Sequence, residues 1–158
     1  EFPAEMAKVC AKADLIVPNL TEASLLTGLP YRTEYDESYI REMLQSLAKL
    51  GPRYVALTGV SFEKGRLGVM YYDQKEDTYG SYFAEHLPAS FHGTGDVFAS
   101  TCVGALMRGL PLGEALALAA DYTVECIRLT LASPEAKWYG VEFESAIPYL
   151  VKRLEEGK

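Results

Sequence analysis

The sequence predicts a mixed α/β fold in which helices pack against a sheet. Over roughly the first sixty residues, short apolar runs of strand length alternate with segments of helical periodicity. Two segments rich in tyrosine and valine then follow each other across a short charged turn, which indicates an antiparallel hairpin. Alternating strands and helices favour a layered fold, and the hairpin adds strands to its sheet.

The elements of the N-terminal part are placed by their start and stop signals. We expect a helix over 2–12, the end of a buried strand at 15–17, a short helix from Asn19 or Thr21 to Gly28, a helix over 37–50 and a buried strand over 54–58. The helix over 37–50 is the clearest, because apolar residues recur at helical spacing and Gly51 follows as a stop. Its predicted buried face comprises Ile40, Met43, Leu44 and Leu47.

The C-terminal part is predicted to be mostly helical after the hairpin. The expected strands span 66–73 and 78–83, and the expected helices span 96–108, 112–131 and 142–155, with a loop over 133–140. The helix over 96–108 carries small or apolar residues on most sides, which predicts that it is buried. Pro148 lies inside the last predicted helix and should kink or shorten it, because proline cannot donate a backbone hydrogen bond.

Composition and charge disfavour one class of function, the binding of nucleic acid. The chain has 158 residues, of which 49% are apolar and 23% charged, as expected for one globular domain. Its formal net charge is −7. This acidic balance would repel a nucleic acid, so we expect no binding to DNA or RNA. ATP is compatible with it, because a local cluster of backbone N–H groups and a magnesium ion can supply positive field.

The cysteines and the apolar runs bear on the compartment. Cys10, Cys102 and Cys126 are odd in number and show no metal-ligand spacing, which predicts buried, reduced thiols and disfavours structural zinc. No apolar run is long enough for a membrane span, and no signal peptide is visible, so we expect a cytoplasmic protein. The first residue is Glu1 and a predicted helix follows at once, from which we expect the chain to be part of something larger.

The most informative motif is the glycine turn Gly93-Thr94-Gly95-Asp96, which opens an apolar helix. Glycines let successive backbone N–H groups converge on one anion, and the positive end of a helix strengthens that attraction. A carboxylate beside such an anion site can take a proton from a hydroxyl that attacks a phosphoryl group. The alternative is an ordinary turn in which Asp96 only favours the helix dipole. The strand-rich segment before the turn and the apolar helix behind it favour the functional interpretation.

Two further motifs follow predicted strands, and each has a structural alternative. Asn19 and Glu22 are spaced as a capping box, in which each side chain accepts the backbone N–H of the other. Alternatively, Glu22 lies at the carboxyl end of a strand, where α/β proteins bind ligands, and it could hold magnesium. Thr58-Gly59 taken alone favours an ordinary strand-to-loop turn, although Gly59 would also let a nucleotide approach the backbone closely.

Taken together, the motifs resemble those of the pyridoxal/pyridoxamine kinases of the ribokinase-like superfamily. The matching segments are Pro18-Asn19-Leu20-Thr21-Glu22-Ala23, Leu57-Thr58-Gly59 and His92-Gly93-Thr94-Gly95-Asp96-Val97-Phe98, in that order, with similarity continuing to the tail at 138–143. Sugar kinases of this superfamily usually show Gly-Ala-Gly-Asp. Hydroxymethylpyrimidine phosphate kinases usually carry cysteine where Asp96 stands, so the motif favours the pyridoxal side.

The resemblance implies a fold and a set of roles. It implies a ribokinase-like three-layer α/β/α fold, of which residues 1–158 would form the C-terminal, ATP-binding portion of a larger kinase domain, with the hairpin extending the sheet. Asp96 would be the catalytic base on the substrate's hydroxymethyl oxygen. The implied binding groups are the N–H groups of Gly93, Thr94 and Gly95 for the transferring phosphoryl group, Glu22 with Asn19 for the magnesium–phosphate network, Thr58 and Gly59 for ATP, and Val17 and Leu87 near the nucleotide.

The implied activity is ATP- and Mg²⁺-dependent phosphorylation of the 5′-hydroxymethyl group of pyridoxal, pyridoxamine or pyridoxine, in vitamin B6 salvage. A homodimer and a monovalent cation are also implied. Kinases of this family are longer and bind pyridoxal mostly through an N-terminal half that this chain lacks, so we expect the 158-residue piece alone to have little or no kinase activity. The alternatives are a hydroxymethylpyrimidine or sugar kinase of the same superfamily, and a non-catalytic nucleotide-binding module.

Overall fold

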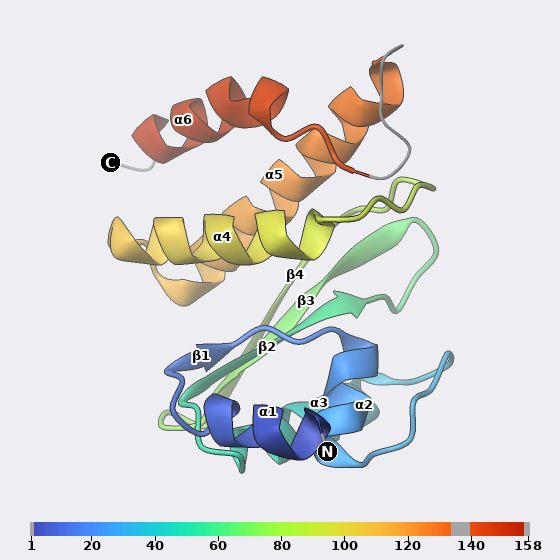
Figure 1. Ribbon diagram of the computed structural model, residues 1–158, viewed down its shortest axis with the longest axis vertical. Coiled ribbons are helices and arrows are strands. Elements are labelled where there is room, and N and C mark those ends of the chain that lie inside the picture. The colour runs from blue at the N-terminus through green and yellow to red at the C-terminus, as the bar shows by residue number, and fades with distance from the viewer. Residues whose placement is uncertain (1, 134–139, 157–158) are drawn as a thin grey trace. The chain divides into compact units, whose positions relative to one another are not determined.

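The computed structural model describes residues 2–133 and 140–156 and confirms the mixed α/β class (Figure 1). The chain divides into two compact units, Glu1–Ser81 and Tyr82–Lys158, and each unit is described by itself. The loop expected over 133–140, including Trp138, falls almost wholly outside the described residues. Of the helices in the described ranges, none is long and apolar enough to cross a membrane.

The first unit contains a sheet and three helices. The helices are α1 (Phe2–Cys10), α2 (Leu20–Thr27) and α3 (Glu37–Ala48), and the strands are β1 (Leu15–Ile16), β2 (Tyr54–Val60), β3 (Arg66–Asp73) and β4 (Thr78–Glu85), the last of which continues into the second unit. The strand order is β1-β2-β3-β4. β1 pairs with β2 in parallel and β2 with β3 antiparallel, so the sheet is mixed and the predicted hairpin extends it.

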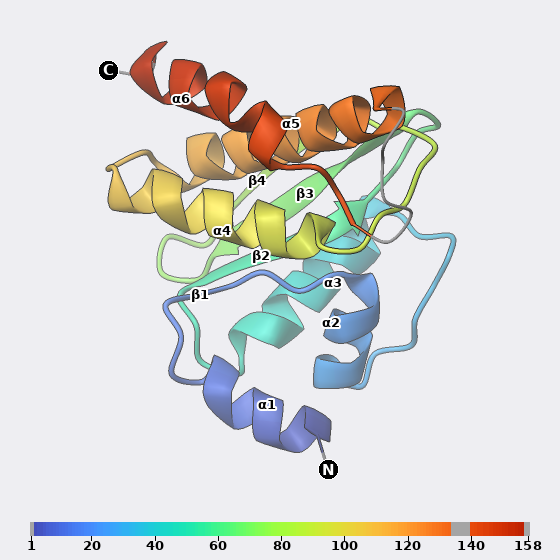
Figure 2. The same cartoon turned by 45° about the horizontal axis from the view of Figure 1, so that its top comes forward.

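The core of the first unit forms where α3 covers the sheet. α3 contacts both β2 and β3, and α2 contacts β2 (Figure 2). The four apolar residues predicted to share one face of α3 are all buried, as are Val55, Ala56 and Leu57 on β2. The spacing of the apolar residues predicted this packing correctly, because a half-buried helix needs one continuous apolar stripe and α3 has one.

Two expectations for the strands need correction. Leu15 and Ile16 in β1 are only partly buried, where a buried strand was expected. β2 was expected to end at Thr58 but continues to Val60, with an irregularity in its pairing to β3 between Thr58 and Val60. Gly59 lies at this irregularity with φ of 76°, a left-handed conformation that glycine adopts without steric cost. The strand therefore passes through the glycine instead of stopping there.

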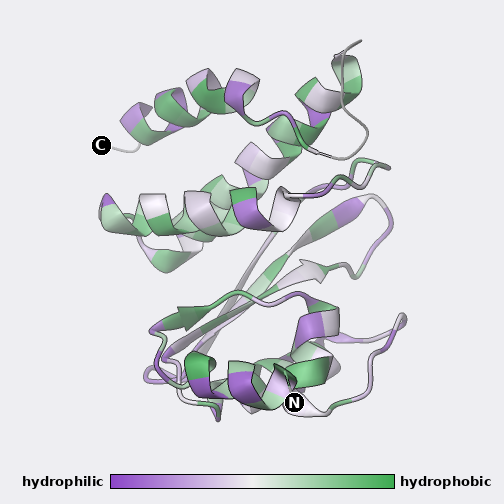
Figure 3. Ribbon diagram, in the orientation of Figure 1, coloured by the Kyte–Doolittle hydropathy of each residue, from purple (hydrophilic) through white to green (hydrophobic). Residues whose placement is uncertain are grey.

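The second unit is helical beyond the end of β4. It contains α4 (Thr94–Met107), α5 (Leu112–Ala132), a 3₁₀ turn at Glu144–Ala146 and α6 (Ile147–Glu156). α4 packs against α5, and α5 contacts the 3₁₀ turn and α6. Hydrophobic and hydrophilic residues alternate along α6 in Figure 3, as expected for a helix that packs by one side.

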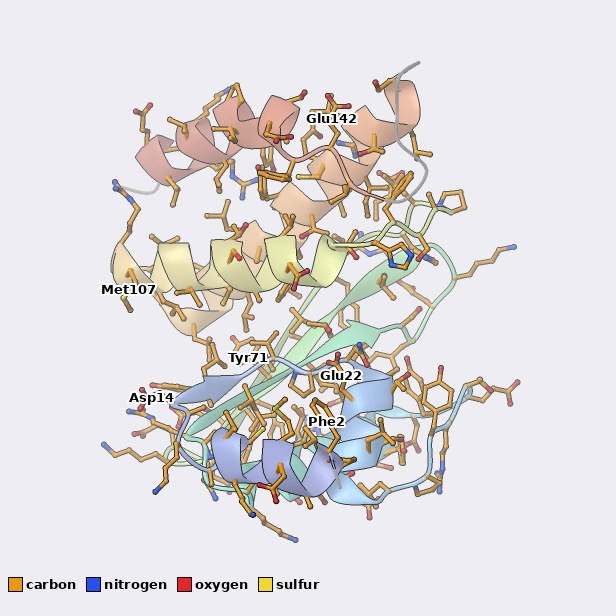
Figure 4. All side chains as sticks on the ribbon, in the orientation of Figure 1. Phe2, Asp14, Glu22, Tyr71, Met107 and Glu142 are labelled. Carbon is orange, nitrogen blue, oxygen red and sulfur yellow. The ribbon has the colours of Figure 1, made fainter. Side chains whose placement is uncertain are left out.

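Two expectations for these helices are also corrected. α4 begins at Thr94 instead of Asp96, so Thr94 and Gly95 belong to its first turn. It was expected to be buried on most sides, yet Val103 is 53% and Met107 80% exposed, because its buried residues form a single face comprising Phe98, Thr101, Cys102 and Ala105. Met107 is labelled in Figure 4 at the end of α4.

The last helix is shorter than the range of 142–155 suggested, as Pro148 led us to expect. A 3₁₀ turn precedes α6, and Pro148 is the second residue of α6 itself. In the first turn of a helix the backbone N–H has no intrahelical acceptor, so proline is tolerated there. The prediction that the cysteines are buried is also confirmed, since Cys10, Cys102 and Cys126 are free and buried.

Candidate functional site

The first group of predicted site residues lies where β1 and β2 end. The backbone N–H of Thr58 donates to the carbonyl of Pro18 at 2.9 Å, and Asn19 and Thr58 form a parallel bridge. The carboxyl ends of neighbouring parallel strands meet at one edge of a sheet, which is where α/β proteins bind ligands. Val17, Asn19, Thr58 and Gly59 therefore lie together at this edge.

Glu22 and Asn19 form a capping box, which was one of the two interpretations that their spacing allowed. Asn19 Oδ1 accepts the N–H of Glu22 at 2.9 Å, and Glu22 Oε2 accepts the N–H of Asn19 at 2.9 Å. Helix α2 then ends at Gly28, whose φ of 74° is left-handed. Figure 4 labels Glu22 at the start of α2. The capping interpretation is thus confirmed, and Glu22 Oε1 is the carboxylate oxygen outside the box.

Gly59 combines a left-handed backbone with open space. It is exposed, and no described atom lies within 4 Å of the position that a Cβ would take. The conformation of the chain, rather than crowding by neighbouring protein atoms, therefore requires glycine here. The open space leaves the backbone accessible to a ligand, as a nucleotide contact would require.

The second group of site residues forms the start of α4. Gly93 is the N-cap with φ of 86°, and its carbonyl accepts the N–H of Val97 at 2.9 Å. The hydroxyl of Thr94 donates to the carbonyl of Phe91 at 3.3 Å, which closes the turn. In the described part of the chain no side chain caps this helix. The backbone N–H groups of the first turn are therefore not capped by a described side chain, and the positive end of the helix dipole lies behind them.

Asp96 lies in the same first turn and is exposed. Its carboxylate is therefore available both to water and to a molecule bound at the helix start. A substrate hydroxyl bound there could donate a hydrogen bond to the Asp96 carboxylate. The backbone N–H groups of the same turn would lie beside it. This is the arrangement that a general base and an anion site require.

Gly95 lies in the first turn of α4, where none of the described residues requires glycine. Its φ is not positive, and no described atom lies within 4 Å of the place where a Cβ would stand. Glycine in a helix is destabilising by roughly 0.5–1 kcal/mol relative to alanine. At the start of α4, such a glycine leaves the backbone of the first turn accessible to a ligand.

The remaining predicted residue, Leu87, follows β4 in the second unit. It is half-buried, and its carbonyl accepts the N–H of Ala89 at 2.8 Å. It lies before the turn at Gly93 in the chain and is not part of it. The site residues thus fall into a strand-end group in the first unit and a helix-start group in the second unit, apart from Leu87.

One contact at the helix start was not predicted from the sequence. The N–H of Val141 donates to the carbonyl of His92, the residue before Gly93, at 3.2 Å. The tail motif around Val141 carried part of the family resemblance, but no spacing signal linked it to the glycine turn. Such a backbone contact depends on how helices dock and leaves no mark in a local sequence pattern.

Comparisons with known proteins identify the family. A family model described as phosphomethylpyrimidine kinase matches residues 2–139. The chain is 35% identical over 133 residues to the thiamine biosynthesis bifunctional protein ThiED of Geobacter sulfurreducens, covering 81% of this chain and 25% of that protein. It therefore spans about a quarter of the length of that curated relative.

Solved structures agree with this result. A protein of Bacteroides thetaiotaomicron classed as a phosphomethylpyrimidine kinase superposes with a TM-score of 0.88 at 32% identity, covering 94% of this chain and 51% of that one. The pyridoxal kinase of Lactobacillus plantarum superposes with a TM-score of 0.84 at 29% identity, covering 98% of this chain and 55% of that one. The chain thus spans about half of each. It belongs to the phosphomethylpyrimidine kinase family, within the ribokinase-like superfamily that includes the pyridoxal kinases.

Proposed function

We propose that residues 1–158 are the ATP-binding, C-terminal portion of a kinase that phosphorylates the hydroxymethyl group of a small aromatic heterocycle. One observation carries this proposal: α4 begins with an uncapped turn at Gly93–Asp96 that offers N–H donors and a carboxylate side by side. Phosphoryl transfer requires mainly positioning and neutralisation of charge, which such a turn supplies. Membership of a kinase family supports the assignment.

In this proposal the helix start performs the chemical step. Asp96 accepts the proton of the substrate's hydroxymethyl group as the hydroxymethyl oxygen forms a bond to the γ-phosphorus of ATP. The bond between the γ-phosphorus and the β,γ-bridging oxygen breaks, and ADP leaves. The backbone N–H groups of Gly93, Thr94 and Gly95 hold the oxygens of the transferring phosphoryl group, on which charge is spread in the transition state. Because these donors are fixed by the helix, they need not reorganise as the reaction proceeds.

The strand-end group would bind the nucleotide. Asn19, Thr58 and Gly59 offer polar side chains and an accessible backbone, and Val17 and Leu87 are proposed to lie near the base or ribose. Glu22 fits Mg²⁺ in a limited way, because one of its oxygens serves the capping box and the other is outside it. Mg²⁺ commonly takes one or two carboxylates and fills its remaining positions with water and phosphate oxygens, so a single free oxygen suffices.

We propose a B6 vitamer, namely pyridoxal, pyridoxamine or pyridoxine, as the substrate. Asp96 supports this choice through the family resemblance, since the hydroxymethylpyrimidine phosphate kinases usually carry cysteine at this position. The Bacteroides thetaiotaomicron relative has also been crystallised with pyridoxal, at 32% identity to this chain. The product would be the 5′-phosphate of the vitamer.

A hydroxymethylpyrimidine substrate is the second candidate. The matching family model is that of a phosphomethylpyrimidine kinase, and the curated relative ThiED is a thiamine biosynthesis protein. Both substrates present a hydroxymethyl group on a flat nitrogen heterocycle, so the helix start would serve either one. Discrimination has to come from contacts with the ring.

The deciding experiment compares substrates and removes the base in the full-length protein that contains this chain. Turnover with ATP is measured for pyridoxal, pyridoxamine, pyridoxine and hydroxymethylpyrimidine, and ATP affinity is measured by calorimetry. Asp96→Asn should lower turnover at least about a hundredfold, the usual contribution of a general base, and leave ATP affinity within about threefold. Glu114→Gln, which neutralises the first-turn acid of α5, is the matched control and should leave turnover unchanged.

The outcomes separate the alternatives. Near-normal turnover by Asp96→Asn would refute the assignment of the base. Faster turnover with hydroxymethylpyrimidine than with any B6 vitamer would transfer the assignment to the second candidate. Tight ATP binding without transfer to any of these substrates would indicate a non-catalytic nucleotide-binding module.

A further inference from the structure

Within the second unit, backbone hydrogen bonds hold residues 141–143 against α5 and the turn before α4. The N–H of Val141 donates to the carbonyl of His92 at 3.2 Å, and the N–H of Glu142 donates to Thr130 Oγ1 at 2.8 Å. The carbonyl of Phe143 accepts the hydroxyl of Tyr122 at 2.8 Å. Glu142 is labelled in Figure 4 on the segment that leads into α6. An irregular segment with successive anchored residues is held in one conformation, and the anchors are side chains of α5 and the turn before α4.

Thr130 is the most deeply buried of these anchors. Its side chain is completely buried, and its hydroxyl donates to the carbonyl of Cys126 at 2.7 Å while accepting the N–H of Glu142. A buried N–H without an acceptor is costly, so the hydroxyl fixes where Glu142 can lie.

Val141 links this anchored segment to the start of α4. It packs with Val97 against the buried cluster of Tyr122, Cys126 and Ala146, and Val97 is in the first turn of α4. Its N–H also holds the carbonyl of His92, directly before the left-handed Gly93. The glycine turn is therefore fixed on its N-terminal side by Val141 and on its helical side by the contact of Val97 with the same cluster.

We propose that Thr130 is a positioning residue for the phosphate-binding turn, acting through Glu142 and Val141 on His92 and Gly93. This inference deepens the proposed function and rests on it for its catalytic consequence. The chain of contacts lies entirely in the second unit. These contacts orient the N–H groups of the turn toward the phosphoryl group in the transition state. Loss of the contacts should therefore lower kcat more than it raises the KM for ATP.

The test compares three variants in the full-length protein. Thr130→Val keeps the shape of the side chain and removes the hydroxyl, whereas Thr130→Ser keeps the hydroxyl. Thr123→Val is the matched control, because Thr123 is on the same helix and, among the described residues, its hydroxyl donates only to the carbonyl of Ala119, at 2.8 Å. Measurements are kcat, the KM for ATP, and amide hydrogen exchange at Val97, Val141 and Glu142.

We expect Thr130→Val to speed exchange at these amides by about tenfold and to lower kcat by a similar factor, with KM for ATP changing less than about threefold. Thr130→Ser should restore both, and Thr123→Val should change neither. If Thr130→Val does not fold, Tyr122→Phe, which frees the carbonyl of Phe143, replaces it with the same expected pattern.

Unchanged exchange at Val97 in Thr130→Val would overturn the inference, and so would faster exchange with an unchanged kcat. Failure of the proposed function is distinguishable, because the wild-type protein would then transfer no phosphate to any substrate. In that case the exchange at Val97 alone decides whether Thr130 positions the turn.

Discussion

At the scale of single residues, Gly95 and Gly104 form a matched pair within α4. Both lie in the helix without positive φ, and neither has a described atom within 4 Å of a Cβ position. Only Gly95 belongs to the turn proposed to hold phosphate. Alanine at either position should therefore be accommodated by the fold, and only one should affect a ligand.

Gly95→Ala is expected to raise the free energy of unfolding by roughly 0.5 kcal/mol and to lower kcat at least about tenfold, because the new methyl group occupies space that the phosphoryl oxygens need. Gly104→Ala should give a similar stability gain and normal kcat. Urea unfolding and steady-state kinetics check both. Full activity in Gly95→Ala would show that no ligand approaches this backbone.

Substitutions at Glu22 can separate its role in the capping box from its proposed role in binding Mg²⁺. Glutamine can still accept the N–H of Asn19 in the capping box but brings no negative charge, whereas alanine does neither. We expect Glu22→Gln to unfold at nearly the wild-type urea concentration and to need more Mg²⁺ for half-maximal turnover. Glu22→Ala should show the same Mg²⁺ requirement and lose about 1 kcal/mol of stability as well. A wild-type Mg²⁺ dependence in Glu22→Gln would leave only the capping role.

At the scale of elements, the start of α3 depends on Asp36. Asp36 is its N-cap, and its Oδ1 accepts the N–H of Tyr39 at 2.9 Å and the hydroxyl of Ser38 at 2.8 Å. These hydrogen bonds, first that from Tyr39, favour the charged form and hold the pKa of Asp36 below its ordinary value of 3.8. Because α3 supplies much of the core of the first unit, this cap acts on the whole unit.

The lowered pKa gives a signed prediction. A carboxyl group with a lower pKa in the folded state stabilises it fully above the unfolded pKa, near pH 4, and loses that contribution as pH falls through the folded pKa. The wild-type protein should therefore lose stability relative to Asp36→Asn as the pH falls below about 4. Urea midpoints at several pH values measure this difference. Parallel pH profiles for the two proteins would contradict it.

At the scale of the whole molecule, the reactivity of the buried cysteines measures how readily the structure around each of them opens. Cys10 lies in Glu1–Ser81, and Cys102 and Cys126 lie in Tyr82–Lys158. Burial raises the pKa values of the Cys102 and Cys126 thiols to about 11, so little thiolate forms at neutral pH. Each thiol should react with a disulfide reagent only when its surroundings open.

We expect Cys10 to react first. It is the only described residue of α1 that is buried, so few packing contacts oppose local opening of this helix. Cys102 and Cys126 should react more slowly and at similar rates, since both are in the helical unit. Peptide mass spectrometry of samples quenched over time measures the rates, and denatured protein provides the reference. Faster reaction at Cys102 than at Cys10 would contradict this order.

Much of the fold could be predicted because its determinants are close together in the sequence. The cap of α2 at Asn19, its end at Gly28 and the apolar face of α3 all depend on residues within a few positions of one another. The glycine turn was predicted for the same reason. By contrast, the burial of α4 was overestimated, because composition shows that a helix is apolar but not which of its faces meets a neighbour.

The sequence by itself determined the α/β class, the helix limits set by caps and the family motifs, since these follow from local hydrogen bonding and periodicity. Tertiary structure decided that β2 passes through Gly59 to Val60 and that Val141 holds His92 before the glycine turn. Strand register and docked segments join residues far apart in the chain, and the free energy of such contacts depends on packing that no local pattern encodes.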